Sequence, residues 1–408
     1  MKFYVEKELC TERLLPRMRT LQIIFCILLL TIVGFIGWQL NLLYKTSCSD
    51  SIHIGSLFAQ INESREEGTK CQAKTSLFFL KTHKCGSSTV QNILMRFGRR
   101  HNLFFVLPES DNYLGNPEHF SPEFIGPKVQ IPNGEKYDIF THHTRYDHEA
   151  IRGIMKDGTP FVTIMRDPIK LQLSLYDYYY LQYFNDKSLP ELLHQNLSEV
   201  EDKPRYRYRV GWNQISWDLG VDHSRMKMAH TLPYLVNKVE NEFDLVMITE
   251  FMEASLVLLA DLMCWPLEEV RFITANARVM DPKSNNKNIV LTDEEIAVLE
   301  KLNRIDIQLY SHFKQRFKQL ILEYGRDRMM SDVNRLVDMN NKLYRDCIAS
   351  IRPPNKNQVQ VTQYELKPDA PKTCREVLLP ELKFTDGLRS DQEKRVAAIK
   401  KLRDFLDT

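Results

Sequence analysis

The chain of 408 residues has almost no excess of charge. Its 55 basic and 53 acidic side chains leave a formal net charge of +2. A protein that binds nucleic acid in general carries a strongly one-sided charge, so this balance argues against that class. The sequence also has no internal repeats and no low-complexity bias. The composition is that of a globular protein, long enough for one large domain or two ordinary ones.

Several motifs of common nucleotide and metal sites are missing. The chain has no Gly-x-x-x-x-Gly-Lys-Ser/Thr loop, which argues against a P-loop kinase. It has no Asp-x-Asp, which a metal-dependent glycosyltransferase usually needs to hold manganese and a nucleotide-sugar. The eight cysteines are irregularly spaced and match no zinc pattern. The function therefore has to be sought in other motifs.

One long apolar run is present near the start of the chain. The run "LQIIFCILLLTIVGFIGWQL" has no charge and is long enough to cross a bilayer as a helix. Three arginines precede it, which predicts a cytoplasmic N-terminus, and the bulky ending "WQL" is unlike the small-residue end of a cleaved signal peptide. We therefore predict a type II membrane protein with a cytoplasmic tail (1–20), a transmembrane signal anchor (21–40), a lumenal stem (41–74) and a lumenal domain (75–408).

The predicted lumenal part contains cysteines and glycosylation sequons. Disulfides can form in the lumen, although their pairing cannot be read from the sequence. The sequons "NES" and "NLS" predict glycosylation at Asn62 and Asn196. The cysteines predicted to be lumenal are Cys48, Cys71, Cys85, Cys264, Cys347 and Cys374.

Apolar runs alternate with helical patterns from residue 75 onward. The segments "TSLFFL", "YDIFTHH", "PFVTIMRDP" and "FDLVMITE" have the pattern of buried strands. Helical patterns follow the first, third and fourth, which predicts an α/β fold with a parallel sheet covered by helices on both faces. The last third is predicted to be helical, with a capping box at Thr292 and Glu295, a helix end at Gly325 and an extended segment beyond Ser350.

The loop "KTHKCGSST" lies between the first strand and its helix. A helix N-terminus offers unpaired N–H groups and the positive end of the helix dipole, so this turn is suited to an anion. Gly86 allows a phosphate close to the backbone, Ser87, Ser88 and Thr89 add hydroxyl groups, and Lys84 adds a positive charge. The alternative is an ordinary strand-to-helix turn with a serine cap and a solvated lysine.

A second cation follows the third predicted strand. Arg166 in "IMRDP" lies at the carboxyl edge of the sheet, where ligands of open α/β sheets bind, and arginine suits a bidentate grip on phosphate. Ser174 follows on the next helix. The alternatives are a structural pair of Arg166 with Asp167 or a surface arginine. Together with the first loop, this motif supplies two anion sites, as a nucleotide with phosphate at both ends requires.

At these motifs the chain resembles the galactose-3-O-sulfotransferase family, over roughly residues 75–313. The chain departs from the family at Cys85-Gly86, where members have Thr-Ala. The resemblance implies a sulfotransferase fold, the co-substrate 3′-phosphoadenosine 5′-phosphosulfate and a galactose 3-hydroxyl as acceptor. It rests on "FLKTHKCGSSTVQNILMRFGRRH", "THHTRY", "VTIMRDP", "SWDLGVD", "DLVMITEFMEASLVLLADLMCW" and "LNRIDIQLYSHF".

The resemblance also implies roles for single residues. Lys84 is expected to bind the bridging oxygen and to stabilise the leaving phosphate. His143 in "THHTRY" is expected to be the general base, because a sugar hydroxyl needs a group that takes its proton near neutral pH. The remaining assignments are the 5′ phosphate to Gly86, Ser87, Ser88 and Thr89, and the 3′ phosphate to Arg166 and Ser174.

Alternatives stay open around the predicted base. His142 competes with His143, and only one of the two can face the cleft if the strand is regular. A structural histidine in a loop is a third option. His142, His143, Asp147 and His148 also resemble a metal cluster, but their spacing matches no zinc signature, and we expect no metal.

Two other segments have an open interpretation. The segment "RYRYRVGWNQISW" mixes arginines and aromatic rings, which suits either an acceptor sugar or acidic head group, or a solvated loop. Cys85 adjoins Lys84, but no base accompanies it, so we expect a buried or disulfide-linked cysteine rather than a nucleophile.

The acceptor and the cellular context are expectations of the same kind. We expect a Golgi membrane enzyme that acts on a galactose-terminated glycolipid or glycan. Another glycan hydroxyl, of heparan or chondroitin type, is an alternative acceptor. An inactive membrane-anchored glycan-binding homologue is the non-enzymatic alternative, although the expected site residues are all present. The sequence leaves open whether two copies form a homodimer.

Overall fold

A computed structural model of the protein describes residues 71–132, 134–274, 290–352 and 363–408. The predicted cytoplasmic tail, the signal anchor, most of the stem and the Asn62 sequon lie outside the described residues. Within the described ranges, no helix combines the length and the apolar character that a membrane span needs.

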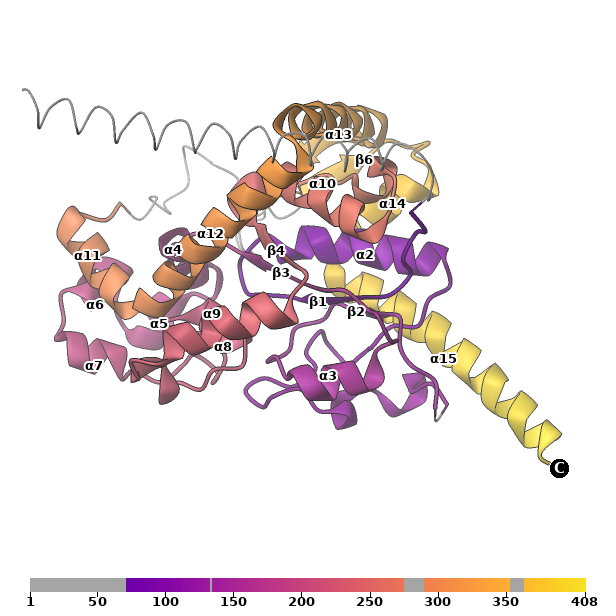
Figure 1. Cartoon of the computed structure of the whole chain (residues 1–408), viewed down its shortest axis with the longest axis horizontal. Helices are drawn as coiled ribbons and strands as arrows, with labels where there is room; N and C mark the ends of the chain where they lie inside the picture. The colour runs from indigo at the N-terminus through magenta and orange to yellow at the C-terminus, as the bar shows by residue number, and fades with distance from the viewer. Residues whose placement is uncertain (1–70, 133, 275–289, 353–362) are drawn as a thin grey trace, which may run out of the picture. The chain divides into compact units, whose positions relative to one another are not determined.

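Four parallel strands form the central sheet (Figure 1), in the order β2-β1-β3-β4. Every residue of these strands is buried, as expected for a parallel sheet covered on both faces. The four predicted strands and the α/β class are thereby confirmed, although each strand is shorter than its apolar segment. The strands are β1 (Leu77–Leu80), β2 (Ile139–Phe140), β3 (Phe161–Met165) and β4 (Leu245–Ile248).

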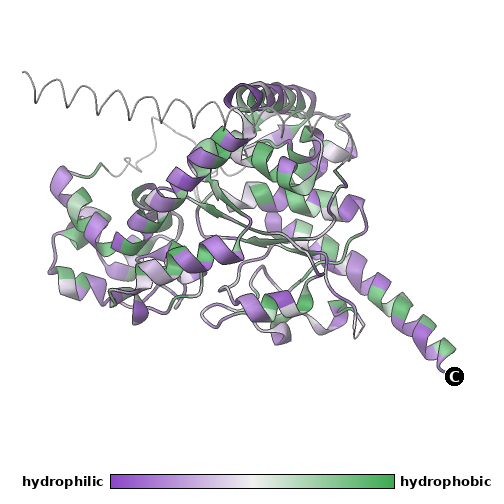
Figure 2. Cartoon of the chain, in the orientation of Figure 1, coloured by the Kyte–Doolittle hydropathy of each residue, from purple (hydrophilic) through white to green (hydrophobic). Residues whose placement is uncertain are grey.

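Aromatic side chains fill the centre of the sheet. The ring of Phe78 on β1 lies 5.1 Å from that of Phe140 on β2 and 4.8 Å from that of Phe161 on β3, centroid to centroid. Phe78 is also the register partner of both residues, so the three rings line one face across three strands. Figure 2 shows these apolar strands within helices that alternate between polar and apolar faces.

Helices lie on both sides of the strands. In Figure 1, α2 (Ser87–Arg100) and α10 (Met252–Met263) lie above the strands and α3 (His148–Ile154) lies below them. The other helices are α4 (Pro168–Tyr178), α5 (Leu181–Asn185), α6 (Leu189–Leu193), α7 (Leu197–Glu201), α8 (Gln214–Asp218), α9 (Thr231–Glu242), α11 (Asp293–Leu302), α12 (Arg304–Tyr324), α13 (Arg326–Cys347), α14 (Lys372–Val377) and α15 (Glu381–Leu406). Short 3₁₀ helices are η1 (Pro122–Phe124), η2 (Pro127–Val129), η3 (Arg225–Lys227), η4 (Thr249–Phe251) and η5 (Leu267–Val270).

Two predicted helices are each divided in two. The aromatic segment after β3 breaks at Tyr180, whose φ of 52° is left-handed, so α4 ends and α5 begins there. The long helix from Thr292 breaks at Asn303, which is buried and accepts a hydrogen bond from the backbone of Asn213. The capping box at Thr292 and Glu295 and the helix end at Gly325 are confirmed.

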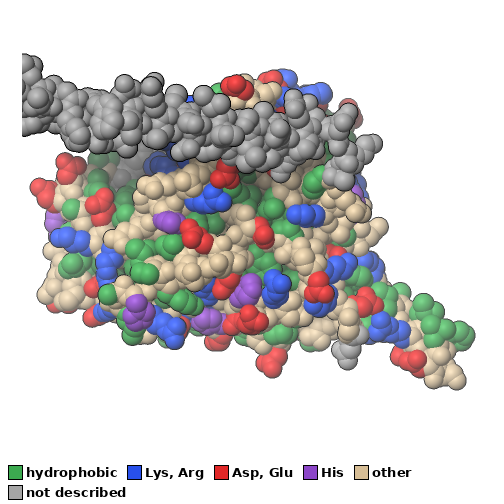
Figure 3. Space-filling view, viewed as in Figure 1, with side chains coloured by type: hydrophobic (Ala, Val, Ile, Leu, Met, Phe, Trp, Pro, Cys, Tyr) green, Lys and Arg blue, Asp and Glu red, His purple; other side chains and the backbone are tan. Residues whose placement is uncertain are grey.

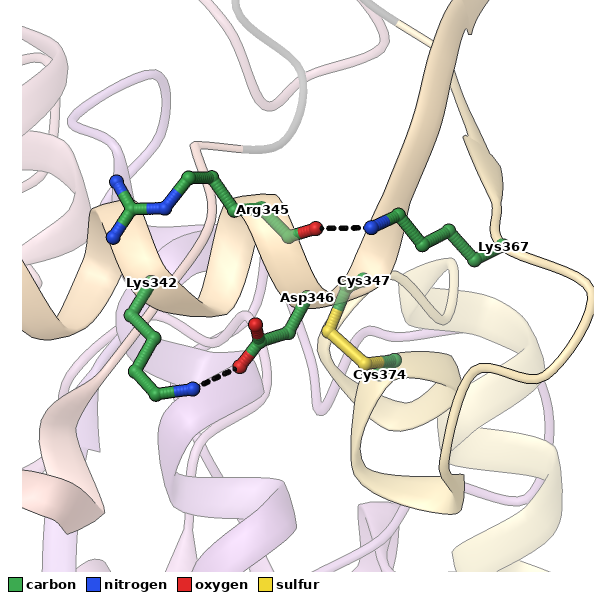
Figure 4. The surroundings of a disulfide bond; sticks show 6 residues. All are labelled: Lys342, Arg345, Asp346, Cys347, Lys367 and Cys374. Carbon is green, nitrogen blue, oxygen red and sulfur yellow. Dashed lines mark hydrogen bonds and ion pairs between the residues drawn. A yellow bond between two sulfur atoms is a disulfide. The ribbon is translucent and has the colours of Figure 1, made fainter.

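The C-terminal part adds a second, smaller core. Strands β5 (Ile348–Arg352) and β6 (Gln363–Leu366) form an antiparallel ribbon, so part of the segment that we predicted to be extended is a strand. A disulfide joins Cys347 to Cys374, where α13 meets α14 (Figure 4). Cys71 and Cys264 are disulfide-bonded as well. The disulfide lies among buried apolar residues, Ile273, Ile348, Ala370 and Val377.

The surface agrees with the nearly neutral net charge. In Figure 3, basic and acidic side chains are intermixed over the visible face instead of being separated by sign. A nucleic-acid site would concentrate Lys and Arg on one face. The visible face therefore offers no support for that class of partner.

Candidate active site

The loop between β1 and α2 makes a sharp turn. Lys84 and Gly86 both have left-handed backbone angles, with φ of 56° and 69°. Gly86 is the N-cap of α2, and no side chain caps the helix there. A Cβ atom at Gly86 would lie 2.9 Å from the terminal methyl carbon of Met252, the far end of a flexible side chain, so the turn favours glycine mainly for its φ.

The hydroxyl groups of the loop have different partners. Ser87 donates to the carbonyl of Thr82 at 2.7 Å and so closes the loop on itself. Ser88 donates to the carboxylate of Glu381 at 3.4 Å. The backbone N–H of Thr89 donates to the carbonyl of Gly86 at 3.1 Å. Ser87 is thus a structural part of the loop, whereas Ser88 points toward charged side chains.

Lys84 and Arg166 adjoin in space. Arg166, directly after β3, donates from Nη1 to the backbone carbonyl of Lys84 at 2.9 Å. The Nζ atom of Lys84 lies 3.5 Å from the ring centroid of Tyr178, at the end of α4. The guanidinium of Arg166 thus lies against the backbone of the turn, at the edge shared by the adjacent strands β1 and β3, where the sequence predicts an anion site.

The alternative interpretation of Arg166 as half of an Arg–Asp pair does not match the structure. The carboxylate of Asp167 accepts from the backbone N–H of Lys170 at 3.0 Å and so caps α4. Ser174 lies two turns into the same helix and is 8% exposed. It is on the predicted element, but its part in holding a phosphate is a prediction that the structure leaves untested.

The side chain of His143 contacts Lys81 at both ring nitrogens. Nδ1 lies 3.0 Å from the Lys81 carbonyl oxygen, which can only accept, so Nδ1 carries the proton. Nε2 lies 2.9 Å from the Nζ atom of Lys81 and accepts from that ammonium group. Burial and the charge of Lys81 hold the pKa of His143 well below its ordinary value, so the ring is neutral at physiological pH.

His142 faces elsewhere. Its Nε2 lies 3.0 Å from the hydroxyl of Thr385 on α15, and burial lowers the pKa of His142 to about 4. The two neighbouring histidines therefore point to different partners, although both lie beyond the end of β2. His143 is the one beside the loop, and its role as base stays a prediction.

The sequence analysis missed a second histidine of the site. Nδ1 of His83 lies 2.9 Å from the buried carboxylate of Asp218, the last residue of α8. Nε2 of His83 lies 3.1 Å from the hydroxyl of Tyr113, and the His83 ring stacks on that of His143 with centroids 4.4 Å apart. Both partners lie in quoted motifs, but nothing local in the sequence connects residues 83 and 218.

Lys81 and Glu381 were also missed. Lys81 directly follows β1 and is 2% exposed. Its Nζ atom lies 2.9 and 2.8 Å from the two carboxylate oxygens of Glu381, the first residue of α15. Asn112 donates to the same carboxylate at 2.7 Å. A charged side chain from the C-terminal helix thus lies beside the loop of the first strand.

The candidate metal ligands have ordinary partners instead. Asp147 caps α3 through the N–H of Ala150, and Nδ1 of His148 lies 2.8 Å from the hydroxyl of Tyr146. Within the described residues, no group of three or more His, Cys, Asp or Glu side chains is arranged to hold a metal ion.

Arg205 and Cys85, from the two other places whose role was left open, are both buried. Arg205, in the segment that mixes arginines and aromatics, is 9% exposed and donates to the Trp212 carbonyl at 2.9 Å, so it supports the fold. The thiol of Cys85 is buried and free, as predicted, and burial raises its pKa to about 12. A thiol with that pKa is not a nucleophile at neutral pH.

The arrangement combines an anion site with a proton acceptor. The N-terminus of α2 and the side chain of Arg166 adjoin the turn after β1, and the neutral imidazole of His143 contacts Lys81, the first residue after that strand. Such a site is suited to holding an anionic donor while a histidine takes a proton from an incoming hydroxyl.

Comparison with known proteins identifies the family. The galactose-3-O-sulfotransferase family matches residues 13–399, and the chain belongs to it. Galactosylceramide sulfotransferase of Mus musculus is 30% identical over 361 residues, which are 82% of this chain and 83% of the relative. Galactose-3-O-sulfotransferase 3 of Homo sapiens is 29% identical over 81% of this chain and 80% of its own length. Galactose-3-O-sulfotransferase 2 of Sus scrofa is 29% identical, covering 78% and 84%. The chain is therefore a galactose sulfotransferase by family.

Proposed function

We propose that the protein transfers a sulfuryl group from 3′-phosphoadenosine 5′-phosphosulfate to the 3-hydroxyl of a terminal β-galactose. The observation that carries this proposal is the hydrogen bond between Arg166 and the carbonyl of Lys84. It places the Arg166 guanidinium, from the end of β3, against the turn that follows β1 and contains Lys84. A donor with phosphate at both ends needs two cationic contacts of this kind.

The two ends of the donor are assigned to different residues of the site. The turn from Lys84 to Thr89 holds the 5′ phosphate through backbone N–H groups and the hydroxyl of Ser88. Lys84 binds the oxygen between sulfur and phosphorus, where negative charge builds as the bond breaks. Arg166 and Ser174 hold the 3′ phosphate. The positive φ of Lys84 and Gly86 supports this division, because it turns the loop sharply at the helix N-terminus.

The reaction is an in-line displacement at sulfur. The galactose oxygen forms a bond to sulfur, and the bond between sulfur and the 5′-phosphate oxygen breaks with its electron pair. The hydroxyl proton passes to a histidine, and the leaving nucleotide takes the negative charge, which Lys84 stabilises. No oxidant, reductant or metal ion enters this balance.

His143 is the proposed base. Its ring is neutral at physiological pH because burial and Lys81 lower its pKa, so Nε2 has a lone pair. That lone pair accepts from the Lys81 ammonium, and the acceptor hydroxyl takes the place of this donor before its proton is transferred. His83 is a second candidate for a specific reason. Asp218 accepts from its Nδ1–H, the arrangement that orients and stabilises an imidazolium in other enzymes. The two candidates make different predictions for single variants.

The acceptor is proposed to be a galactose-terminated glycolipid or glycan. One relative is named a galactosylceramide sulfotransferase, and others are named galactose-3-O-sulfotransferases. These names support galactose and the 3-position over a heparan or chondroitin hydroxyl. They also favour an active enzyme over an inactive glycan-binding homologue.

A Golgi membrane with the catalytic domain in the lumen is the proposed location. The disulfide between Cys347 and Cys374 is compatible with an oxidising compartment. Asn196, the second sequon, is exposed at the start of α7, where a glycan has room. Both observations agree with a lumenal domain.

The function is tested with the full chain in detergent and isotope-labelled phosphosulfate donor. Galactosylceramide, lactosides, Gal-GlcNAc and Gal-GalNAc glycans and heparan fragments serve as acceptors. We expect label on terminal galactose, and a loss of about 10²–10³ in kcat for Lys84→Ala, because one preorganised contact to the leaving group is removed. Lys170→Ala, an exposed lysine on α4, is the control and is expected to retain activity.

Each outcome of the acceptor panel is decisive. Label on heparan alone would keep the chemistry and overturn galactose as the acceptor. Donor binding without transfer to any acceptor would favour the inactive glycan-binding homologue. Full activity of Lys84→Ala would overturn the assignment of the leaving-group contact.

A further inference from the structure

We propose that Lys81 and Glu381 are positioning residues of the transfer site, and that Glu381 makes the C-terminal helix part of that site. Glu381 holds the Lys81 ammonium on Nε2 of His143, and this contact fixes which ring nitrogen carries the proton. The inference rests on the proposed function, in which His143 takes the acceptor proton.

The ammonium group of Lys81 has a partner for each of its donors. Nζ of Lys81 has three donors, and the structure gives it three acceptor atoms within 2.9 Å, the two oxygens of Glu381 and Nε2 of His143. The side chain is 2% exposed, so water does not compete for these bonds. A buried ammonium is tolerated only when it is paired in this way. Lys81 is therefore fixed in place.

The carboxylate of Glu381 is held in its charged form. Burial opposes the ionisation of Glu381, but Lys81 and Asn112 outweigh it and hold the pKa of the carboxyl below its ordinary value. Glu381 is thus charged, with contacts to Lys81, Asn112 and Ser88. Its position at the first turn of α15 also suits a negative charge, since the helix dipole is positive there.

The ring of His143 is held by contacts at both nitrogens and on its faces. The carbonyl of Lys81 accepts from Nδ1 and the ammonium of Lys81 donates to Nε2, so one residue contacts both nitrogens. Exchange of the ring proton to Nε2 would place two donors face to face. The stacked rings of His83 and Tyr113, at 4.4 and 5.0 Å, hold the imidazole plane. The lone pair of His143 is consequently held toward the Lys81 ammonium, in the place that the acceptor hydroxyl takes for the transfer.

The titratable groups around His143 come from several elements. Lys81 and His83 lie in the loop after β1, and Tyr113 lies in the loop before η1. His142 directly precedes His143 in the chain. Glu381 on α15 and Asp218 on α8 act through Lys81 and His83. Lys81 is the nearest cation of this set, so its removal has the clearest expected consequence for His143.

The test compares a neutral replacement of the pair with the wild-type full chain. Lys81→Met with Glu381→Gln removes both buried charges together, because a single variant leaves one charge unpaired and can fail to fold. The matched control is Lys128→Met with Glu393→Gln. That pair is exposed, lies 3.7 Å apart and also uses a glutamate of α15. Thermal unfolding confirms that each protein is folded.

Two readouts are taken. Nitrogen NMR of ¹⁵N-histidine-labelled protein, with the His143 signal assigned from His143→Gln, reports the tautomer and titration of the ring without any turnover. Steady-state kinetics over pH reports kcat and the KM of the donor. In the double variant we expect His143 to titrate at higher pH and the acidic limb of kcat to move upward with it, because the nearby positive charge is gone. We expect kcat at neutral pH to fall about 10–100-fold while the donor KM changes less than about threefold, as for groups that orient a ligand-contacting residue.

The outcomes separate this inference from the proposed function. An unchanged titration of His143 in the double variant would overturn the inference, whatever the activity. A shifted titration with a lower kcat, absent from the Lys128–Glu393 control, would support it. A wild-type enzyme that sulfates none of the acceptors would overturn the proposed function, while the NMR result would still decide whether Lys81 and Glu381 set the state of the ring.

Discussion

Two histidines only 4.4 Å apart have opposite electrostatic partners. His83 has a carboxylate, Asp218, at Nδ1 and a phenol, Tyr113, at Nε2. His143 has a carbonyl at Nδ1 and an ammonium, Lys81, at Nε2. Both rings carry the proton on Nδ1, so the difference lies in the charge beside each ring. Burial and the Lys81 ammonium oppose a second proton on His143. Two residues of the same type in one site thus have partners of opposite charge.

The largest expected effect separates the two rings as bases. We expect His143→Gln to lower kcat by about 10²–10⁴, the usual contribution of a general base, and His83→Gln to lower it far less. The measurement is initial-rate sulfation of a galactose acceptor at saturating donor. The reverse pattern would assign the base to His83 and leave His143 as a structural ring.

A smaller effect is expected on the carboxylate side of the comparison. Asp218 is fully buried and accepts from the N–H and ring of His83 and from Gln214. Asp218→Asn replaces an acceptor oxygen with an amide donor, so we expect the free energy of unfolding to fall by about 1–3 kcal/mol. Urea denaturation followed by circular dichroism measures this.

The catalytic consequence of the same variant sharpens the comparison. If His143 is the base, Asp218→Asn lowers kcat by less than about tenfold, well below the loss of a base. A loss of about 10²–10⁴ in both Asp218→Asn and His83→Gln, in proteins that are still folded, would show that the Asp218–His83 pair takes the proton.

The smallest expected effect is in the pH profile. Because the pKa of His143 is lowered, the wild-type acidic limb of kcat/KM should lie below the ordinary histidine value of about 6.5. Removing a neighbouring ring that can become positive relieves part of this lowering, so His83→Gln should move the limb upward by less than about one pH unit. A wild-type limb centred at or above about 6.5 would contradict the state that we assign to His143.

The elements near the site could be predicted because their signals are local. The buried strand β1, the turn and the apolar face of α2 are contiguous in the sequence, and periodicity shows them directly. The same holds for Arg166 at the end of β3, since a proline follows two residues later. The shared edge of these strands then follows from the rules for parallel sheets.

The rest of the site depends on contacts between distant residues. His83 and Asp218 are 135 positions apart, and Lys81 and Glu381 are 300 positions apart. Periodicity in one sequence carries no information on such pairs. The helix break at Asn303 was missed for a related reason, because the side chain of Asn213 binds the Leu302 carbonyl and the Asp306 N–H, which an unbroken helix would pair with each other.

The disulfide between Cys347 and Cys374 has a consequence for where the chain can mature. Glu381 follows Cys374 by only seven residues, so a covalent bond anchors the segment that brings this carboxylate to the first strand. A crosslink of this kind reduces the conformations available to the segment before it docks. In a reducing compartment the same chain would lack the bond, and the start of α15 would rely on noncovalent contacts alone. The redox state of the surroundings and the geometry around Lys81 are thereby linked through seven residues of backbone.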